Sequence, residues 1–227
     1  MSGCALGVGG YGALGSAISS ALAADGLRVL RSSRTAREDD PEAVVLPTDG
    51  TVPDNLPVLD SVVWAQGINV NDSLPTFTDE DLDHVLDVNV VSVARQMRAL
   101  VQSGAVTHGA RLVVLSSVWE VVARPGKFSY TVAKAALGGL VRAAALDLAP
   151  LGVLVNAVLP GGVETPMTRA MLTAEQIAGF ERATGADRMV APNDVAAVVA
   201  YLASGRNTGM TGQSVTVDLG FTVGRIL

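Results

Sequence analysis

Cysteine and histidine are scarce in this chain of 227 residues. Its one cysteine, Cys4, excludes an intramolecular disulfide bond, because such a bond needs a second thiol. The two histidines are not accompanied by any Cys/His spacing typical of a zinc site. We therefore expect a protein without a disulfide framework and without a bound metal ion.

Long apolar runs and clusters of basic residues are also missing. No run reaches the roughly 18 apolar residues of a membrane-spanning helix, although mean hydropathy is high, at +0.39. The net charge of −6 and the scattered arginines disfavour binding to nucleic-acid phosphates. The N-terminus lacks the basic segment that opens a secretory signal peptide. These absences predict a cytoplasmic protein that binds neither a membrane nor a nucleic acid.

Short apolar runs alternate along the chain with longer amphipathic runs. This alternation is typical of βαβ units, and strands buried on both faces of a parallel sheet would explain the high hydropathy. We expect one domain over residues 1–227 with a Rossmann-type doubly wound α/β fold, about seven parallel strands and helices on both faces. Pro47, Pro53 and Pro57 oppose helices, so the crossovers near them should be short. The expected strands are residues 4–8, 28–32, 43–46, 61–65, 111–116, 154–158 and 214–217, and the expected helices are residues 13–24, 79–103, 129–148 and 193–202.

The first expected strand runs into a glycine-rich turn that precedes an apolar helix. Gly10, Gly12 and Gly15 satisfy the pattern G-x-G-x-x-G. Such glycines allow a tight turn and a close approach of the backbone to a pyrophosphate, whose charge suits a helix N-terminus. The motif therefore predicts a dinucleotide site with contacts from Gly9, Gly10, Tyr11, Gly12, Ala13 and Leu14.

The end of the second expected strand indicates which dinucleotide is bound. An NAD site usually has an acid there, which holds the ribose hydroxyls. This strand ends in Ser33 and Arg34 instead, with no acid before Glu38. Because an arginine can bind a 2′-phosphate through two charge-assisted hydrogen bonds, we expect NADP(H) to be favoured over NAD(H). The alternative is that Arg34 is a solvated loop residue.

Tyr130 and Lys134 lie four residues apart and therefore share one face of an expected helix. A nearby ammonium favours the phenolate, so we expect Lys134 to lower the pKa of Tyr130. Tyr130 could then exchange a proton with a substrate hydroxyl while a hydride moves to or from a nicotinamide. The pattern is common by chance, and a surface pair is the alternative.

Further residues around this pair resemble the active-site segment of short-chain dehydrogenases/reductases. The resemblance implies a catalytic tetrad of Asn89, Ser117, Tyr130 and Lys134. In this family the serine binds the substrate oxygen, the lysine contacts the nicotinamide ribose, and the asparagine supports the lysine through a water molecule. The segments that carry the resemblance are residues 87–89, 116–117, 125–126, 129–137, 156–167 and 211–218.

The same resemblance implies further cofactor contacts, in which Asp49 lies beside the adenine and Thr165 meets the nicotinamide amide. The chain departs from the family at Val8 and Ala13, where threonine and glycine are usual, and at residues 64–67, which replace Asn-Asn-Ala-Gly. These departures concern cofactor affinity more than the tetrad. The implied contacts outside the glycine turn are Asp49, Gly50, Ala65, Gln66, Gly67, Pro160, Gly161, Val163 and Thr165.

The resemblance implies an NADP(H)-dependent oxidoreductase that interconverts a small carbonyl compound and a secondary alcohol, assembled as a homodimer or homotetramer. Residues 166–172 resemble those of 3-oxoacyl-(acyl-carrier-protein) reductases. Arg124 and Arg169 could therefore dock an acidic carrier protein, or they could be solvated residues at a pocket rim. A third possibility is a non-catalytic sensor that keeps the dinucleotide-binding fold.

Overall fold

The computed structural model describes residues 3–33, 35 and 37–224, and it confirms the expected fold. In this part of the chain one sheet of seven strands has the order β3-β2-β1-β4-β5-β6-β7, and every neighbouring pair is parallel. The strand order reverses between β1 and β4, as in a doubly wound sheet. The strands are β1 (Cys4–Val8), β2 (Arg28–Ser33), β3 (Ala43–Val45), β4 (Leu59–Trp64), β5 (Val106–Leu115), β6 (Leu154–Pro160) and β7 (Ser214–Val217).

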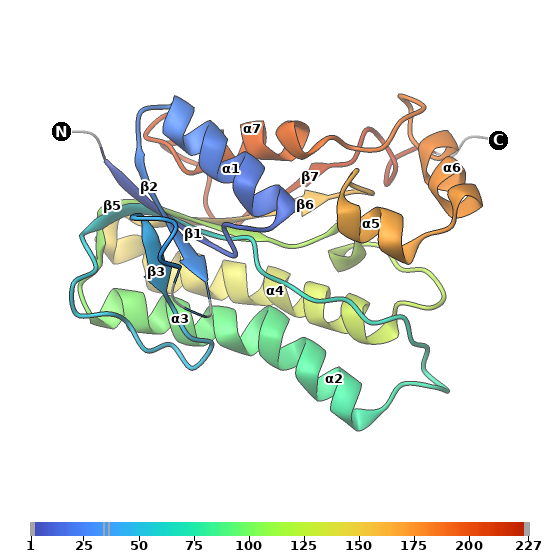
Figure 1. Ribbon diagram of the computed structural model, residues 1–227, viewed down its shortest axis with the longest axis horizontal. Coiled ribbons are helices and arrows are strands. Elements are labelled where there is room, and N and C mark those ends of the chain that lie inside the picture. The colour runs from blue at the N-terminus through green and yellow to red at the C-terminus, as the bar shows by residue number, and fades with distance from the viewer. Residues whose placement is uncertain (1–2, 34, 36, 225–227) are drawn as a thin grey trace.

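Helices cover both faces of the sheet (Figure 1). α1 (Ala13–Ala24) and α7 (Pro192–Leu202) pack on one face, where Ile18 and Val199 are buried against apolar residues of the strands. α3 (Ser92–Gln102) and α4 (Phe128–Asp147) pack on the other, where Val93 and Leu137 are buried. Two apolar layers therefore enclose the sheet, and this burial accounts for the high hydropathy of the chain.

The long helix predicted for residues 79–103 is interrupted by one wider turn. α2 (Asp79–Leu86) begins at Thr78, whose hydroxyl accepts a hydrogen bond from the Asp81 amide. It continues through a π-helical turn, η1 (Asp87–Val91), into α3. π turns are rare and are found frequently at functional sites. This turn carries Asn89, whose side chain is buried on the sheet side.

Three other features differ from the expectation or refine it. β5 begins at Val106, five residues before the predicted start, because Thr107, His108 and Gly109 interrupt the apolar pattern in its first part. In the described residues no helix crosses between β2 and β3 or between β3 and β4, as the prolines predict. Two short helices after β6, α5 (Pro166–Met171) and α6 (Ala174–Arg182), were not expected. A capping box of Thr173 and Gln176 in the sequence marks the start of α6.

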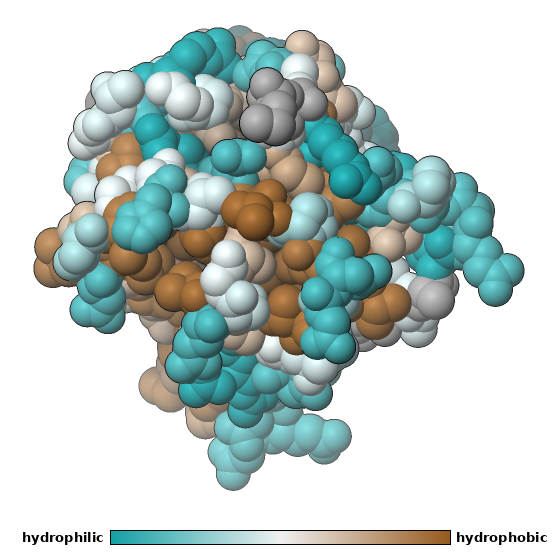
Figure 2. Space-filling view, turned by 90° about the vertical axis from the view of Figure 1, so that its left-hand side faces the viewer, coloured by the Kyte–Doolittle hydropathy of each residue, from teal (hydrophilic) through white to brown (hydrophobic). Residues whose placement is uncertain are grey.

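The N-terminus and the helices α5 and α6 lie at opposite ends of the molecule (Figure 1). The end that carries the N-terminus has a centre of apolar side chains surrounded by hydrophilic ones (Figure 2). At the opposite end lie the helices α5 and α6, which follow the carboxyl end of β6 (Figure 1). None of the helices described is long and apolar enough to cross a membrane. Because parallel strands present all their carboxyl ends at one edge, the ligand site of such a fold is expected at that edge.

Candidate active site

Three adjoining cavities follow the carboxyl ends of the central strands. The first, of about 350 Å³, lies beside the glycine turn and the end of β2, and the second, of about 270 Å³, continues from it toward α4. The third, of about 210 Å³, surrounds Tyr130. Gly12 and Gly67 line both the first and the second cavity, and Ser116 and Thr165 line both the second and the third. The cavities therefore form one extended cleft, which crosses the point between β1 and β4 where the strand order reverses.

Most of the predicted cofactor contacts line this cleft. Gly10 is buried beneath the glycine turn, and Arg34 lies outside the described residues. Gly9 turns the chain with a φ of 75°, and Gly12 begins α1 without a side-chain cap. The first amide groups of α1 therefore face the cleft as an anion site. Gly9, Tyr11, Gly12, Ser33, Gln66 and Gly67 line the first cavity, Ala13, Leu14, Ala65 and Thr165 the second, and Pro160, Gly161 and Val163 the third.

Arg37 is a residue of the first cavity that the sequence analysis missed. Its guanidinium lies 4.2 Å from the centre of the Tyr11 ring, in the lining of the cavity expected to hold the adenosine. Asp40 accepts a hydrogen bond of 2.6 Å from the Tyr11 hydroxyl and forms an ion pair of 2.7 Å with Arg31. Asp40 is therefore already engaged, whereas Arg37 forms an ion pair of 3.1 Å with the exposed Asp39. In the sequence, the position of Arg37 three residues after Arg34 could have indicated it as a second contact for the 2′-phosphate.

Asp49 and Gly50 do not reach the cleft, contrary to what the resemblance implied. The Asp49 carboxylate accepts a hydrogen bond of 2.8 Å from the Thr51 amide and so closes its own turn. Gly50 packs against the backbone carbonyl of Arg95. Leu46 and Thr48 line the first cavity in their place.

Residues 64–67, where the chain departs from the family it resembles, are held in place by α3. The indole of Trp64 donates to the side chain of Gln96 at 3.2 Å, and the side-chain amide of Gln66 donates to the Ser92 hydroxyl at 2.6 Å. Both partners are buried residues on the sheet side of α3. The unusual segment thus keeps its place through two hydrogen bonds, and Gln66 remains part of the cleft wall.

Asn89 holds the loop that follows β4. Its side-chain amide donates to the Ile68 carbonyl and accepts from the Ile68 amide, both at 2.9 Å. A Cβ on Gly67 would lie 2.8 Å from Asn89 Oδ1 and 3.7 Å from Lys134 Nζ, so this position needs glycine. The direct contacts of Asn89 are therefore with the loop, and its predicted support of Lys134 through water stays a prediction.

Lys134, Ser117 and Tyr130 come together where the second and third cavities meet. Lys134 Nζ lies 5.5 Å from the centre of the Tyr130 ring and donates to the Leu115 carbonyl at 3.0 Å. Burial lowers the pKa of Lys134 to about 8. Burial also raises the pKa of Tyr130 to about 12, and only a hydrogen bond with Ser117 opposes this rise. The pKa of Tyr130 is therefore raised and not lowered as expected, because burial outweighs the opposing contribution.

Lys127 is a second site residue that the sequence analysis missed. Its ammonium lies 5.7 Å from the centre of the Tyr130 ring and donates to Asn71 Oδ1 at 2.6 Å. Burial, and next the neighbouring Arg124 guanidinium, lower the pKa of Lys127 to about 8. Lys127 and Lys134 are the only lysines in the sequence. All other basic residues of the chain are arginines, so the position of both lysines near Tyr130 could have indicated Lys127 as a site residue.

The two arginines considered for docking a carrier protein have different surroundings. Arg124 lines the third cavity and the apolar cavity next to it. Arg169 is exposed and forms an ion pair of 2.6 Å with Glu164. Arg124 therefore faces the inside of the site, while Arg169 shares its charge with a carboxylate at the surface.

Comparison with known sequences identifies relatives over most of the chain. A family model described as enoyl-(acyl carrier protein) reductase matches residues 50–222. Cyclopentanol dehydrogenase of Comamonas testosteroni is 33% identical over 165 residues, which are 72% of this chain and 66% of that protein. The 3-oxoacyl-(acyl-carrier-protein) reductase of Escherichia coli (strain K12) is 32% identical over 162 residues, which are 71% of this chain and 66% of that protein. The matches thus span just under two thirds of the relatives' own length.

Solved structures show the same fold over the whole chain. A short chain dehydrogenase family protein from Francisella tularensis has a TM-score of 0.87 at 24% identity, over 99% of this chain and 100% of that one. The ligand-free aldohexose dehydrogenase of Thermoplasma acidophilum has a TM-score of 0.85 at 21% identity, over 100% of this chain and 96% of that one. Identities this low carry the fold and nothing about substrates.

Proposed function

This chain belongs to the short-chain dehydrogenase/reductase family, and we propose that it is an NADP(H)-dependent oxidoreductase that interconverts a carbonyl compound and a secondary alcohol. The observation that carries the proposal is the meeting of Ser117, Tyr130 and Lys134 at the junction of the second and third cavities. One cavity leads from there to the glycine turn, and the other is free for a small substrate.

The cleft fits a dinucleotide in shape and in chemistry. The uncapped start of α1 at Gly12 suits a pyrophosphate, and Lys134 lies at the cavity that follows it. Arg37, together with the predicted contact from Arg34, supports a preference for a 2′-phosphate. The bound cofactor supplies or accepts the hydride at its nicotinamide ring.

The protonation states assign roles to the side chains. With a pKa raised to about 12, Tyr130 carries its proton at neutral pH and can donate it to a substrate oxygen as a carbonyl is reduced. Ser117 shares a hydrogen bond with Tyr130 and can hold the same oxygen. Lys134 is placed to contact a ribose and, with a pKa of about 8, to pass the proton onward. Asn89 is a positioning residue that fixes the loop beside Lys134.

A 3-oxoacyl thioester reductase is a second candidate, favoured by the similarity to the Escherichia coli enzyme. The ion pair of Arg169 with Glu164 weakens the case for a docked carrier protein, because part of that charge is already neutralised. A non-catalytic sensor would not need Tyr130 and Lys134 together. Assembly as a homodimer or homotetramer and a cytoplasmic location stay predictions.

Titration with NADPH and NADH, followed by a panel of carbonyl substrates read at 340 nm, tests this proposal. We expect NADPH to bind more tightly, and Tyr130→Phe to keep that binding while turnover falls by about 100- to 10,000-fold, the usual worth of a general acid. Binding without turnover on the whole panel would favour the sensor. If neither cofactor binds, the oxidoreductase proposal is wrong.

A further inference from the structure

The third cavity carries two positive groups and no negative one among its described lining residues. Arg124 and Lys127 both line it, and its remaining members are neutral. The apolar cavity next to it also has Arg124 and no carboxylate in its described lining. This is unexpected in a chain with 22 acidic and 16 basic residues. The positive charge is therefore concentrated at the place where the substrate is expected.

Neither cation forms an ion pair with another described residue. Lys127 is 5% exposed and donates only to the neutral side chain of Asn71. The nearby Asp72 accepts hydrogen bonds from the amide and the hydroxyl of Ser129 instead. Arg124 forms no ion pair in the described part of the chain, and its buried Nε has no hydrogen-bond partner there. Buried charges are costly unless they are paired, so this arrangement calls for an anion.

Lys127 lies close to the reacting group, since its Nζ is 5.7 Å from the centre of the Tyr130 ring. Arg124 lines the same cavity, and its guanidinium lies 5.8 Å from the centre of the Trp119 ring. An anion held by Lys127 and Arg124 would thus share this cavity with a carbonyl held by Tyr130.

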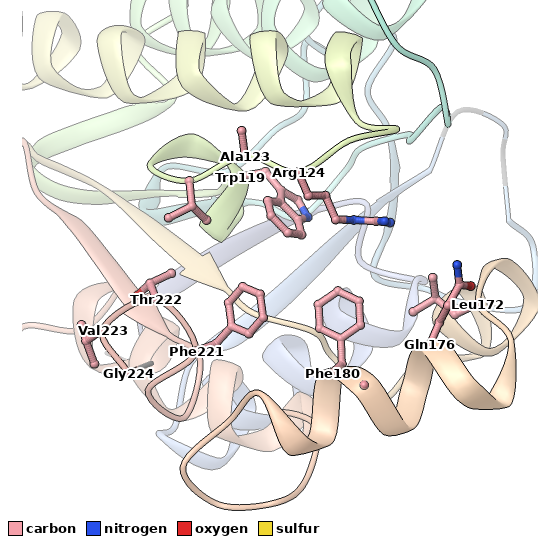
Figure 3. Close-up of a pocket in the computed structure, with 12 residues that line it drawn as sticks. Trp119, Ala123, Arg124, Leu172, Gln176, Phe180, Phe221, Thr222, Val223 and Gly224 are labelled. Carbon is pink, nitrogen blue, oxygen red and sulfur yellow. The ribbon is translucent and has the colours of Figure 1, made fainter. Parts of the chain in front are cut away.

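An apolar cavity of about 540 Å³ adjoins the same groups. Its aromatic rings come from three segments distant in the sequence, and they gather on one side of Arg124 (Figure 3). Trp119 and Phe221 meet edge to face at 6.0 Å, and Phe180 stacks on Phe221 at 5.6 Å. This cavity suits an apolar or aromatic substituent, while Arg124 stands at its border with the third cavity.

From these contacts we infer that the substrate is an oxo acid, or the hydroxy acid of the reverse reaction, whose carboxylate lies between Arg124 and Lys127. Its apolar substituent extends into the cavity of Trp119, Phe180 and Phe221. The inference rests on the proposed function and specifies its substrate class. In the oxidation direction, Tyr130 first gives its proton to solvent. The hydrogen on the alcohol carbon then leaves as hydride to oxidised NADP, and the hydroxyl proton passes to the Tyr130 phenolate. The alcohol is oxidised and the cofactor reduced, while the carboxylate is unchanged.

The test compares hydroxy acids with their methyl esters, which differ in charge and little in shape. The probes are 2-hydroxy-4-phenylbutanoate and 3-hydroxy-5-phenylpentanoate, oxidised with NADP and followed at 340 nm. We expect kcat/KM for at least one acid to exceed that for its ester by about 100-fold, since a charged hydrogen bond contributes about 1.5–3 kcal/mol, a factor of 10–100. Lys127→Gln and Arg124→Gln should each lower kcat/KM for the acid by about 10- to 100-fold and lower it by a clearly smaller factor for the ester, so that the acid-to-ester ratio falls.

Two controls separate the possible failures. Arg206→Gln removes an exposed arginine that pairs with Asp25 and should change neither activity. Calorimetric binding of unreactive 4-phenylbutanoate, with 4-phenylbutanamide as the neutral match, needs no turnover. If the esters react as well as the acids, the inference is wrong and the proposed function stands. If no probe is oxidised, but wild type binds 4-phenylbutanoate and Lys127→Gln does not, the oxidoreductase proposal is wrong and the anion site remains. Equal binding of acid and amide overturns the inference.

Discussion

The substitution Lys127→Met should stabilise the protein at neutral pH, because it removes a buried charge that forms no ion pair with any residue the structure describes. The pKa of a lysine in an unfolded chain is about 10.4, and each unit of difference is worth 1.36 kcal/mol. The folded-state pKa of Lys127 is about 8, so holding its charge costs about 3 kcal/mol. Losing the hydrogen bond to Asn71 costs about 1 kcal/mol. We expect a net gain of about 1–2 kcal/mol at pH 7.

The pH dependence identifies the cause of this gain. Since the folded pKa of Lys127 lies below its unfolded value, the cost is fully present below about pH 8 and disappears as pH rises toward 10.4. The groups facing Lys127 are Arg124, Asp72 and the ring of Tyr130. Urea denaturation of wild type and variant, followed by circular dichroism at pH 7 and pH 10, measures the difference. The reasoning fails if the variant is less stable at pH 7, or if the difference is the same at both pH values.

Two further outcomes follow from the cleft. Gly67→Ala should weaken NADPH binding at least tenfold, because the new Cβ would press on the Asn89 side chain. The matched control is Gly139→Ala, in open space on α4, which should keep NADPH binding and increase the free energy of unfolding by about 0.5–1 kcal/mol. Equal NADPH binding by the two variants would contradict the close contact at Gly67. Arg37→Met should raise the Kd for NADPH more than that for NADH, measured by fluorescence titration, and an equal effect on both would remove Arg37 from the 2′-phosphate site.

The residues closest in sequence were the easiest to predict. The Gly10–Gly12–Gly15 pattern, the spacing of Tyr130 and Lys134, and the alternation of strands and helices are short-range features. Their geometry follows from the periods of a helix and a strand, so the fold and the main members of the cleft could be predicted before any contact was known. The structure confirms the sheet, its parallel strands and the helices on both faces.

Features that depend on long-range contacts were decided only by the tertiary structure. Two hydrogen bonds between the Asn89 side chain and the Ile68 backbone join a π turn to a loop. Neither the π turn nor the loop can be predicted from the periodicity of the local sequence. Burial raises the pKa of Tyr130, and burial is a property of the packed molecule, so the spacing of Tyr130 and Lys134 alone gave the wrong sign.

The charge of the substrate cavity is the clearest case. Lys127 is only three residues from Tyr130, but its value as an anion site depends on which groups leave it without a counter-charge. The loop after β4 supplies the neutral Asn71 to Lys127 and directs Asp72 at Ser129 instead. The sequence by itself determined the fold through its local periodicity, and it predicted the glycine turn and the Tyr130–Lys134 pair, to which the family resemblance added Asn89 and Ser117. The balance of charge around the reacting oxygen was decided by packing, because electrostatic energies depend on distance and burial in three dimensions.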